Sequence, residues 1–430
     1  MITKPIKVID AVMGAGKTTE MFKKIATGEI LFPILYISPF LSEVGGDYIN
    51  TEGVSKKDHH KVKSKIQGGR IQNEVPTGNF KYPKDDTEFT SNKSEHLEYL
   101  VDKCHNISCT HELMQKMTPA TFVCLKEHGY TIIIDEAINS FEDFRLKRSD
   151  LESLVGMNHL TIDGRSQCHR HPDSDYNGVH NHIVRACDNG AVYATNSDQV
   201  LIWEFPTKLF ELGADVWVMT YPFEGTYMKS HFEINSLPYE IVSNESMGIA
   251  SEKEIIQKAA QLLEIYDGKS NAIGNKQEAL SFSSLTLGRG TKAVQGQLST
   301  AMRNVATNVW KADSGSVLWT VYGDAQKGCT PRGYAKRFIP FNKRATNDYA
   351  DVTHIMYGIN RYPRTTLINH ISSRGGSFDR DQYALGEMLQ LLWRGCIRKG
   401  EPMKVFIPSR RMRDLLYSWL SKYEEIAIAA

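Results

Sequence analysis

Short apolar runs recur through the first 235 residues and alternate with segments of helical spacing. Runs this short and this continuous are typical of strands buried in a parallel sheet. Between them, apolar residues recur every three or four positions, as on one face of a helix. The predicted buried strands are residues 6–9, 34–40, 106–109, 131–134 and 215–220, and the predicted helices include 19–28 and 95–104.

Two polar stretches interrupt this pattern, at residues 45–94 and 145–200. We interpret both as inserts, because neither carries the regular apolar runs of its surroundings. The first predicts an irregular excursion. At the end of the second, residues 191–195 and 200–205 predict a hairpin-like pair of strands.

The chain changes character after residue 235. Residues 235–275 are polar apart from one amphipathic helix at 252–266, so we place a domain boundary near 230–245. Beyond it, strands again alternate with helices, which is typical of an α/β domain with a mostly parallel sheet. The predicted strands are 279–285 and 316–323, the predicted helices are 291–310 and 383–399, and residues 404–420 predict a closing strand and helix. The sequence therefore predicts two α/β domains, 1–235 and 236–430.

The composition is ordinary for a globular protein of this length. Of 430 residues, 41% are hydrophobic and 23% are charged, which fits two domains with cores of their own. No run of eighteen apolar residues and no signal-peptide core is visible in the sequence, so we expect no membrane span and a cytoplasmic protein. The seven scattered cysteines favour a reducing compartment over a disulfide framework.

The stretch AVMGAGKT, residues 11–18, lies between the first predicted strand and the first predicted helix. Strand, glycine-containing loop and helix is the context of a phosphate-binding P-loop. Gly14 and Gly16 allow backbone N–H groups to turn toward phosphate oxygens, Lys17 can reach the β- and γ-phosphates, and the Thr18 hydroxyl can bind Mg²⁺. The pattern GxxxxGK[S/T] has glycine where Ala11 stands, and alanine there is common in helicase-type loops. The predicted ATP-binding residues are Ala11, Met13, Gly14, Ala15, Gly16, Lys17, Thr18 and Thr19.

The acid pair Asp135-Glu136 ends the predicted strand 131–134, about 120 residues after Lys17. An acid pair at the end of an apolar strand is the Walker B arrangement. Asp135 would then hold the Mg²⁺ shell, and Glu136 would polarise the attacking water.

A polar, cationic stripe lies within the predicted helix 383–399. Gln390, Arg394 and Arg398 are spaced four residues apart, so they would share one helical face. Such a stripe suits an arginine finger that reaches ATP across a cleft. A second polar segment, RATNDYADV at 344–352, could bind a sugar-phosphate or sense the nucleotide state.

Four other features carry predictions of their own. Ser38 could contact nucleic-acid phosphate or be an ordinary strand end, and Thr110 is a plausible N-cap for the segment after it. Thr220 ends a strand where helicases couple ATP state to nucleic-acid grip. The region 168–187 could bind zinc, although its spacings favour a satisfied polar loop; its candidates are Cys168, His169, His171, His180, His182 and Cys187.

The charge distribution is uneven. The whole chain has a formal net charge of +1, but residues 331–430 carry 17 Lys and Arg against 9 Asp and Glu, a net charge of +8. A basic C-terminal domain is what a protein needs to bind a phosphate backbone, although a solvated basic face has the same composition.

With these motifs in order, the chain resembles superfamily 2 helicases, specifically the DEAD/DEAH-like helicases encoded by bacteriophages. The resemblance rests on AVMGAGKT, IIIDEA, VMTYPFEG, FNKRATNDYADV and QLLWRGCIRKGEPMKVFIPSRRMR. The family pattern Q-x-x-G-R-x-x-R matches at Gln390 and Arg394, whereas Trp393 replaces the glycine and Arg398 comes one residue late.

The resemblance implies two tandem RecA-like domains with ATP and Mg²⁺ between them. Lys17, Thr18, Asp135 and Glu136 would come from the first domain, and the arginines from the second. It also implies an ATP-dependent helicase or translocase acting on nucleic acid, with single-stranded DNA favoured, in the cytoplasm of a phage host and together with other replication or recombination proteins.

Two rival functions stay open. A phage terminase-type packaging ATPase would need a nuclease domain with clustered carboxylates, for which Asp379, Asp381 and Glu387 are the nearest candidates. A nucleotide-gated DNA-binding or recombination protein would bind ATP with little turnover, and the presence of Glu136 argues against it.

Overall fold

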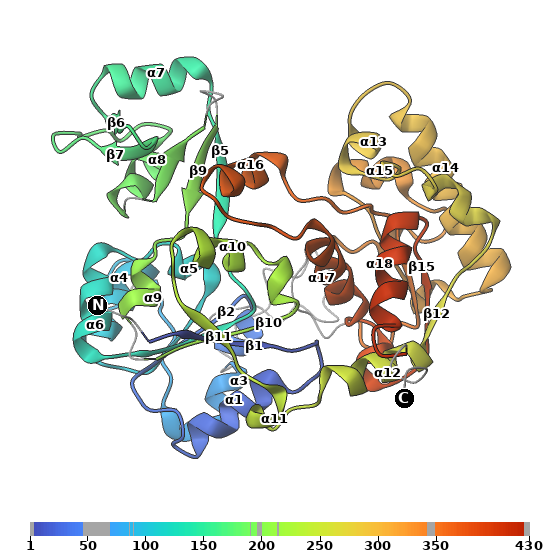
Figure 1. Ribbon diagram of the computed structural model, residues 1–430, viewed down its shortest axis with the longest axis horizontal. Helices are drawn as coiled ribbons and strands as arrows, with labels where there is room; N and C mark the ends of the chain where they lie inside the picture. Colours follow the sequence, from blue (N-terminus) through green and yellow to red (C-terminus); the bar gives the residue numbers. More distant parts are fainter. Residues whose placement is uncertain are drawn as a thin grey trace. The chain divides into compact units, whose positions relative to one another are not determined.

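The computed structural model describes residues 4–45, 69–85, 87–88, 90–189, 191–195, 200–212, 215–341 and 349–424. By its internal contacts the chain forms two compact units (Figure 1). Unit 1 comprises Met1–Asp10, Thr18–Ser243 and Arg364–Phe378, and unit 2 comprises Ala11–Lys17, Asn244–Pro363 and Asp379–Ala430. The chain thus passes between the units several times.

A six-stranded sheet forms the centre of unit 1, in the order β11-β1-β10-β4-β2-β3. All of its neighbouring strands are parallel. Every residue of β2 and β4 is buried, because helices cover both faces of a parallel sheet. The strands are β1 (Ile6–Asp10), β2 (Ile34–Ser38), β3 (Ile107–Thr110), β4 (Thr131–Asp135), β10 (Asp215–Thr220) and β11 (Tyr239–Ile241).

The helices of unit 1 begin and end where local sequence signals favour it. Thr118 caps α6 by accepting a hydrogen bond from the Thr121 amide, and Gly129 ends the helix with φ +62°. Thr110 caps α5 in the same way, as predicted. The helices are α1 (Lys17–Ala26), α2 (Leu41–Val44), α3 (Arg70–Glu74), α4 (Lys93–Asp102), α5 (His111–Met114), α6 (Pro119–His128), α7 (Arg148–Gly156), α8 (Asn181–Ala186), α9 (Lys208–Leu212), α10 (Tyr227–Ile234) and α16 (Thr365–Ser373).

The predicted second insert contains most of a five-stranded antiparallel sheet, in the order β5-β9-β8-β7-β6. The predicted hairpin-like pair is confirmed, since β8 and β9 are antiparallel partners. The strands are β5 (Phe141–Arg145), β6 (Leu160–Ile162), β7 (Gln167–Arg170), β8 (Val192–Ala194) and β9 (Val200–Glu204).

A segment from the second half of the chain, Arg364–Phe378, belongs to unit 1, and we call it the strap. Its helix α16 lies beside β5 (Figure 1). Leu367 and Ile371 of the strap are buried in one small core with Phe141 and Ile202. This excursion was not predicted from the sequence.

Unit 2 contains a four-stranded parallel sheet, in the order β12-β15-β14-β13. The strands are β12 (Leu263–Ile265), β13 (Val317–Thr320), β14 (His354–Tyr357) and β15 (Met403–Phe406). The helices are α11 (Asn244–Met247), α12 (Glu252–Leu262), α13 (Phe282–Thr286), α14 (Thr291–Asn304), α15 (Gln326–Cys329), α17 (Arg380–Leu392) and α18 (Arg410–Leu420). The prediction of an α/β protein with two parallel sheets is therefore confirmed.

Three predicted elements of unit 2 were wrong, and one of them is the helix 383–399, which ends at Leu392. Residues 279–285, predicted as a strand, contain the start of α13, because the Ser281 side chain caps a helix by accepting from the Ser284 amide. The predicted helix 252–266 ends at Leu262, and the chain continues as β12, which pairs with β15.

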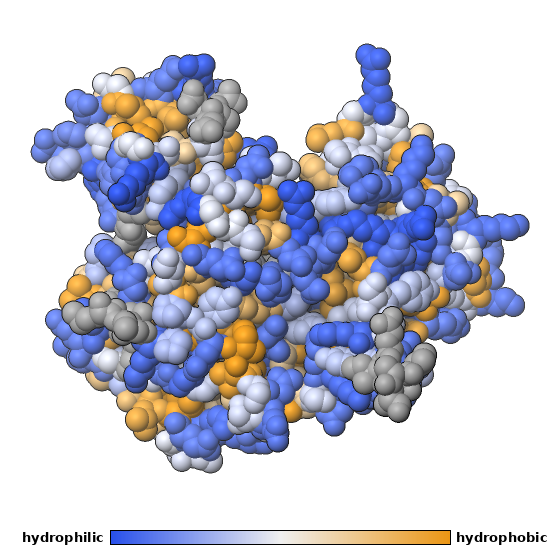
Figure 2. Space-filling view, viewed as in Figure 1, coloured by the Kyte–Doolittle hydropathy of each residue, from blue (hydrophilic) through white to orange (hydrophobic). Residues whose placement is uncertain are grey.

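Hydrophilic residues cover most of the face drawn in Figure 2, with apolar residues in smaller patches between them. Within the described ranges, no helix is both long enough and apolar enough to cross a membrane.

Candidate nucleotide-binding site

The glycine loop after β1 has the backbone conformation that its sequence predicts. Gly14 and Gly16 have φ values of +85° and +97°, a region that side chains with a Cβ rarely adopt. Ala11 does not have a positive φ, which explains why alanine can replace the family's glycine there. Helix α1 then begins at Lys17, so its first N–H groups are available to an anion.

The Lys17 ammonium folds back over its own loop. Its Nζ donates to the carbonyl oxygens of Ala11 and, at 3.3 Å, Val12. The Ala15 amide donates to the Val12 carbonyl at 3.1 Å and closes a turn within the loop. The loop carbonyls therefore hold the lysine cation at the start of α1, the position predicted for binding phosphate.

Thr18 and Asp135, the two predicted Mg²⁺ ligands, lie side by side. Thr18 Oγ1 donates to Asp135 Oδ1 at 3.3 Å, although 117 residues separate them. The sheet explains their approach: β10 pairs with both β1 and β4, and parallel strands bring their carboxyl ends to one edge. Neighbouring oxygen ligands around Mg²⁺ are about 3 Å apart, given metal–oxygen distances of about 2.1 Å. The separation of the two oxygens therefore fits this ion.

Two hydroxyl groups of β2 support the Asp135 carboxylate from behind. Tyr36 Oη donates to Asp135 Oδ2 at 3.0 Å, and Ser38 Oγ lies 3.5 Å from the same oxygen. Burial and then the nearby Asp135 carboxylate raise the pKa of Tyr36 well above its usual range, so this phenol stays protonated and donates. Ser38 is completely buried, which favours an ordinary strand end over a contact with nucleic-acid phosphate.

Glu136 follows the end of β4 with a φ of +64°, in the left-handed region. Its amide donates to the Met219 carbonyl of β10 at 2.8 Å, so the neighbouring strand holds this backbone turn. His111, the first residue of α5, places Nε2 3.0 Å from the Asp135 carbonyl oxygen. The main chain of the acid pair is therefore held from both sides.

Thr220, the predicted coupling residue, ends β10 opposite Asp10 of β1 and is buried. Asp10 Oδ1 in turn accepts a hydrogen bond from the Phe223 amide at 2.9 Å. Thr220 therefore lies at the same edge of the sheet as the glycine loop and the acid pair.

Sequence reasoning missed Tyr36 and His111. Tyr36 lies within an apolar run, and the usable signal was the pair Tyr36 and Ser38, two hydroxyl residues that alternate onto one side of a strand. For His111, the signal was a weak similarity of Thr110-His111 to a nucleic-acid-contacting loop of helicases, and no contact with the acid pair was predicted.

The predicted arginine stripe does not lie on one helical face. Helix α17 ends at Leu392, and Arg398 belongs to a separate short 3-10 helix, Cys396–Lys399. Between them, Gly395 has extended dihedral angles, φ −78° and ψ −172°, so the chain leaves the helical path before Arg398. Gly395 is closely packed, since an added Cβ would lie 2.6 Å from Met403 Sδ and 3.0 Å from the Val352 carbonyl oxygen. Gln390 remains in the last turn of α17, Arg394 follows the helix end and is half-buried, and Arg398 is exposed.

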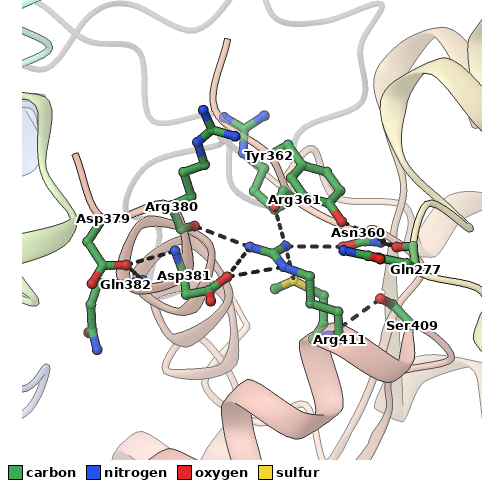
Figure 3. A network of polar contacts seen from close by, with 11 residues as sticks. Gln277, Asn360, Arg361, Tyr362, Asp379, Arg380, Asp381, Gln382, Ser409 and Arg411 are labelled. Carbon is green, nitrogen blue, oxygen red and sulfur yellow. Dashed lines mark hydrogen bonds and ion pairs between the residues drawn. The ribbon is translucent and has the colours of Figure 1, made fainter. Parts of the chain in front are cut away.

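The rival carboxylates of unit 2 each have a structural partner, and Figure 3 shows two of them. Asp379 caps α17 through the amides of Asp381 and Gln382, and Asp381 pairs with Arg411 Nη2 at 2.5 Å. Glu387 pairs with Arg361 at 3.4 Å. These bonds explain the three acids without a metal, which weakens the nuclease rival.

The Cys/His-rich region does not form a zinc site. Among the described residues, which include all six candidates, no group of three His, Cys, Asp or Glu could hold a metal ion. Cys168 is buried in β7, and Cys187 donates to the Ile183 carbonyl at 3.3 Å. The segment 344–352 lies mostly outside the described residues, so its predicted role stays a prediction.

Two comparisons by sequence found related proteins. Residues 257–420 match the model of a family described as the YonV C-terminal Rossmann-like domain, and this range contains the four strands of the parallel sheet of unit 2. The chain is also similar to the SPbeta prophage-derived uncharacterized protein YonV of Bacillus subtilis (strain 168). They are 27% identical over 436 residues, which cover 96% of this chain and 98% of that protein.

Two solved structures are distantly similar. One titled XPD helicase has a TM-score of 0.38 and 10% identity, with 98% of this chain and 91% of that chain covered. A crystal structure of the DUF1998 helicase MrfA bound to DNA and AMPPNP has a TM-score of 0.32 and 9% identity, with 99% of this chain and 48% of that chain covered. Similarities this low do not by themselves identify a function.

Proposed function

We propose that this chain is a Mg²⁺-dependent ATPase of the helicase type, which uses ATP hydrolysis to move along nucleic acid, with single-stranded DNA as the favoured substrate. The observation that carries the proposal is the 3.3 Å contact between Thr18 Oγ1 and Asp135 Oδ1, beside a glycine loop at the carboxyl edge of a parallel sheet. Mg²⁺ in nucleotide sites commonly uses one or two protein oxygens and completes its shell with phosphate and water.

The residues of this edge would divide the work as follows. The loop N–H groups and Lys17 would bind the phosphates, and Thr18 and Asp135 would hold Mg²⁺, which neutralises charge on the β- and γ-phosphates. Glu136 would orient the attacking water, because it follows the metal-binding acid directly. Asp135 would need little rearrangement, since Tyr36 already fixes it.

The parts that concern motion and nucleic acid rest on the family resemblance and on charge. The RecA-like character of both units, ATP bound between them, and Arg394 and Gln390 as transition-state residues come from the family resemblance. Since Arg398 lies beyond the end of α17 and is exposed, we assign the finger role to Arg394 alone. The net charge of +8 in residues 331–430 supports a phosphate-backbone partner.

The first test is ATP hydrolysis by the full chain at fixed low salt, without nucleic acid and with single-stranded DNA, double-stranded DNA or RNA. We expect single-stranded DNA to raise turnover most. Lys17→Ala and Asp135→Asn should each reduce turnover by roughly 100-fold or more, because each removes a group that acts on the developing charge. Lys23→Ala is the matched control, since Lys23 is on the same helix but is largely exposed and pairs with Glu20.

The outcomes separate the rivals. Turnover that no nucleic acid changes would contradict the helicase proposal while leaving the ATPase intact. Tight ATP binding with negligible turnover under every condition would favour a nucleotide-gated binding protein. If Lys17→Ala and Lys23→Ala have equal effects, the glycine loop is not the nucleotide site.

A further inference from the structure

Arg70, the first residue of α3, reaches the helix that follows the glycine loop. Its Nη2 donates to Thr19 Oγ1 at 2.7 Å, although 51 residues separate the two. Thr19 directly follows Thr18, whose hydroxyl contacts Asp135. A guanidinium group is therefore held against the first turn of α1, where N–H groups without helical partners favour an anion.

Aromatic packing ties Arg70 to the predicted metal ligand. The Arg70 guanidinium lies 5.3 Å from the centre of the Phe22 ring, and Phe22 packs edge-on against Tyr36 at 5.3 Å. Tyr36 in turn donates to Asp135 at 3.0 Å. A continuous series of contacts thus joins Arg70 to the carboxylate.

The short helix that carries Arg70 is firmly attached to the sheet. An added Cβ on Gly69 would lie 2.2 Å from the Gly45 nitrogen, so the two backbones meet at the base of the first insert. Gln72 Nε2 donates to the Val44 carbonyl and to Ser108 Oγ, both at 2.8 Å. Arg70 is therefore positioned by described residues of α2, α3 and β3.

Two carboxylates, those of Glu74 and Glu43, lie beside the Arg70 guanidinium group. Its Nε donates to Glu74 Oε1 at 2.6 Å and its Nη2 to Glu74 Oε2 at 3.4 Å, whereas Nη1 forms a looser ion pair with Glu43 at 3.6 Å. The Arg70 side chain is 30% exposed, so solvent reaches part of it. A guanidinium group has five donors in a planar fork, which suits simultaneous contact with a carboxylate and a phosphate.

We propose that Arg70 is a second phosphate-binding cation of the nucleotide site, supplied by the first insert, and that it acts on the α-phosphate side of a nucleoside triphosphate. This rests on the function proposed above. Lys17 serves the β- and γ-phosphates and Thr18 serves the metal, so Thr19 and its arginine partner are left next to the phosphate nearest the nucleoside. Arg70 would then recognise ATP and ADP equally.

The test is equilibrium binding of ATP and of ADP, each with Mg²⁺, to the full chain by calorimetry. Arg70→Ala should raise both dissociation constants by about tenfold, the usual effect of one charge-assisted hydrogen bond. Arg70→Lys should recover part of the loss, because it keeps the charge but lacks the fork. Arg148→Ala is the matched control: Arg148 forms the same i,i+4 pair with Glu152, on α7.

Each outcome bears on a separate statement. A loss confined to ATP would overturn the α-phosphate assignment, since it would mean that Arg70 reads the γ-phosphate. Unchanged constants, with a lower melting temperature of the nucleotide-free protein, would overturn the proposal in favour of a structural role. If Arg70→Ala does not fold, Arg70→Gln and Thr19→Val make the same comparison. Lys17→Ala separates the two proposals, because unchanged ATP binding in that variant would refute the nucleotide site itself.

Discussion

Glu204 binds the strap to the antiparallel sheet of unit 1. We predict that its carboxylate contributes several kcal/mol to the free energy of unfolding. Glu204 Oε1 accepts from His370 Nε2 at 2.6 Å and from Arg374 Nη1 at 2.5 Å. Burial opposes the charged form, yet His370 and Arg374 hold the pKa of Glu204 below its usual range. The carboxylate is therefore ionised at neutral pH, and Glu204→Gln removes its charge with almost no change of shape.

The size of the effect follows from burial. The side chains of Glu204 and His370 are 4% and 6% exposed, whereas Arg374 is 25% exposed. Removing one partner of a buried ion pair costs about 3–5 kcal/mol. Because Arg374 is partly exposed and can turn toward solvent, we expect the lower limit, about 3 kcal/mol. For a unit of this size that corresponds to a fall in melting temperature of roughly 6–12 °C.

Two measurements check this prediction together. Denaturant unfolding gives the global change in free energy, and hydrogen exchange of residues 364–378 shows whether the strap itself is released. Glu112→Gln is the control, since its pair with Lys116 lies on the surface with Glu112 78% exposed, and such pairs contribute about 0–1 kcal/mol. Equal stability of Glu204→Gln and Glu112→Gln, with unchanged exchange in the strap, would refute the argument.

Two further predictions concern the loop and the core. Gly16→Ala should destabilise the protein by about 1–2 kcal/mol in denaturant titrations, because φ is +97° there, whereas Gly156→Ala, at the end of α7 with open space around it, should be neutral or stabilising. Burial lowers the pKa of His231 to about 4, and its Nε2–H donates to the Phe205 carbonyl at 2.7 Å, so folding favours the neutral ring. The His231 contribution to the free energy of unfolding should therefore be constant above pH 6.5 and fall by about 3 kcal/mol toward pH 4. The measured fall should be smaller in His231→Gln, and a pH dependence unchanged by that substitution would contradict the assignment.

The strands and the two motifs of unit 1 were predictable because their signals are local. A run such as Ile34–Ser38 is apolar at nearly every position, which only a strand covered on both faces requires. The positive φ of Gly14 and Gly16 needs glycine itself, so the sequence displays the loop directly. The contact between Thr18 and Asp135 then followed from one rule, that parallel strands end at a common edge.

The failures came from interactions that a local pattern does not contain. Helical spacing continued past Leu392 in the sequence, but the helix ends there and the chain is extended at Gly395, beside Met403 and the Val352 carbonyl. Residues 279–285 are apolar enough for a strand, yet the Ser281 side chain caps a helix that begins at Phe282. In both cases the backbone conformation of a few residues outweighed the periodicity of the segment.

The least predictable residues are those that the inserts bring to the rest of unit 1. Arg70 meets Thr19 across 51 residues, and Glu204 meets His370 across 166. Neither pair has a sequence motif, because any segment that lies nearby in the fold can supply an arginine or a carboxylate. What makes such a contact reliable is the packing that holds its segment: the Gly45–Gly69 approach for Arg70, and the small core around Ile371 for the strap. To find functional residues in a chain of this kind, one should therefore first identify the packing contacts that hold each insert. The next step is to ask which charged side chains those contacts place beside the glycine loop and the acid pair.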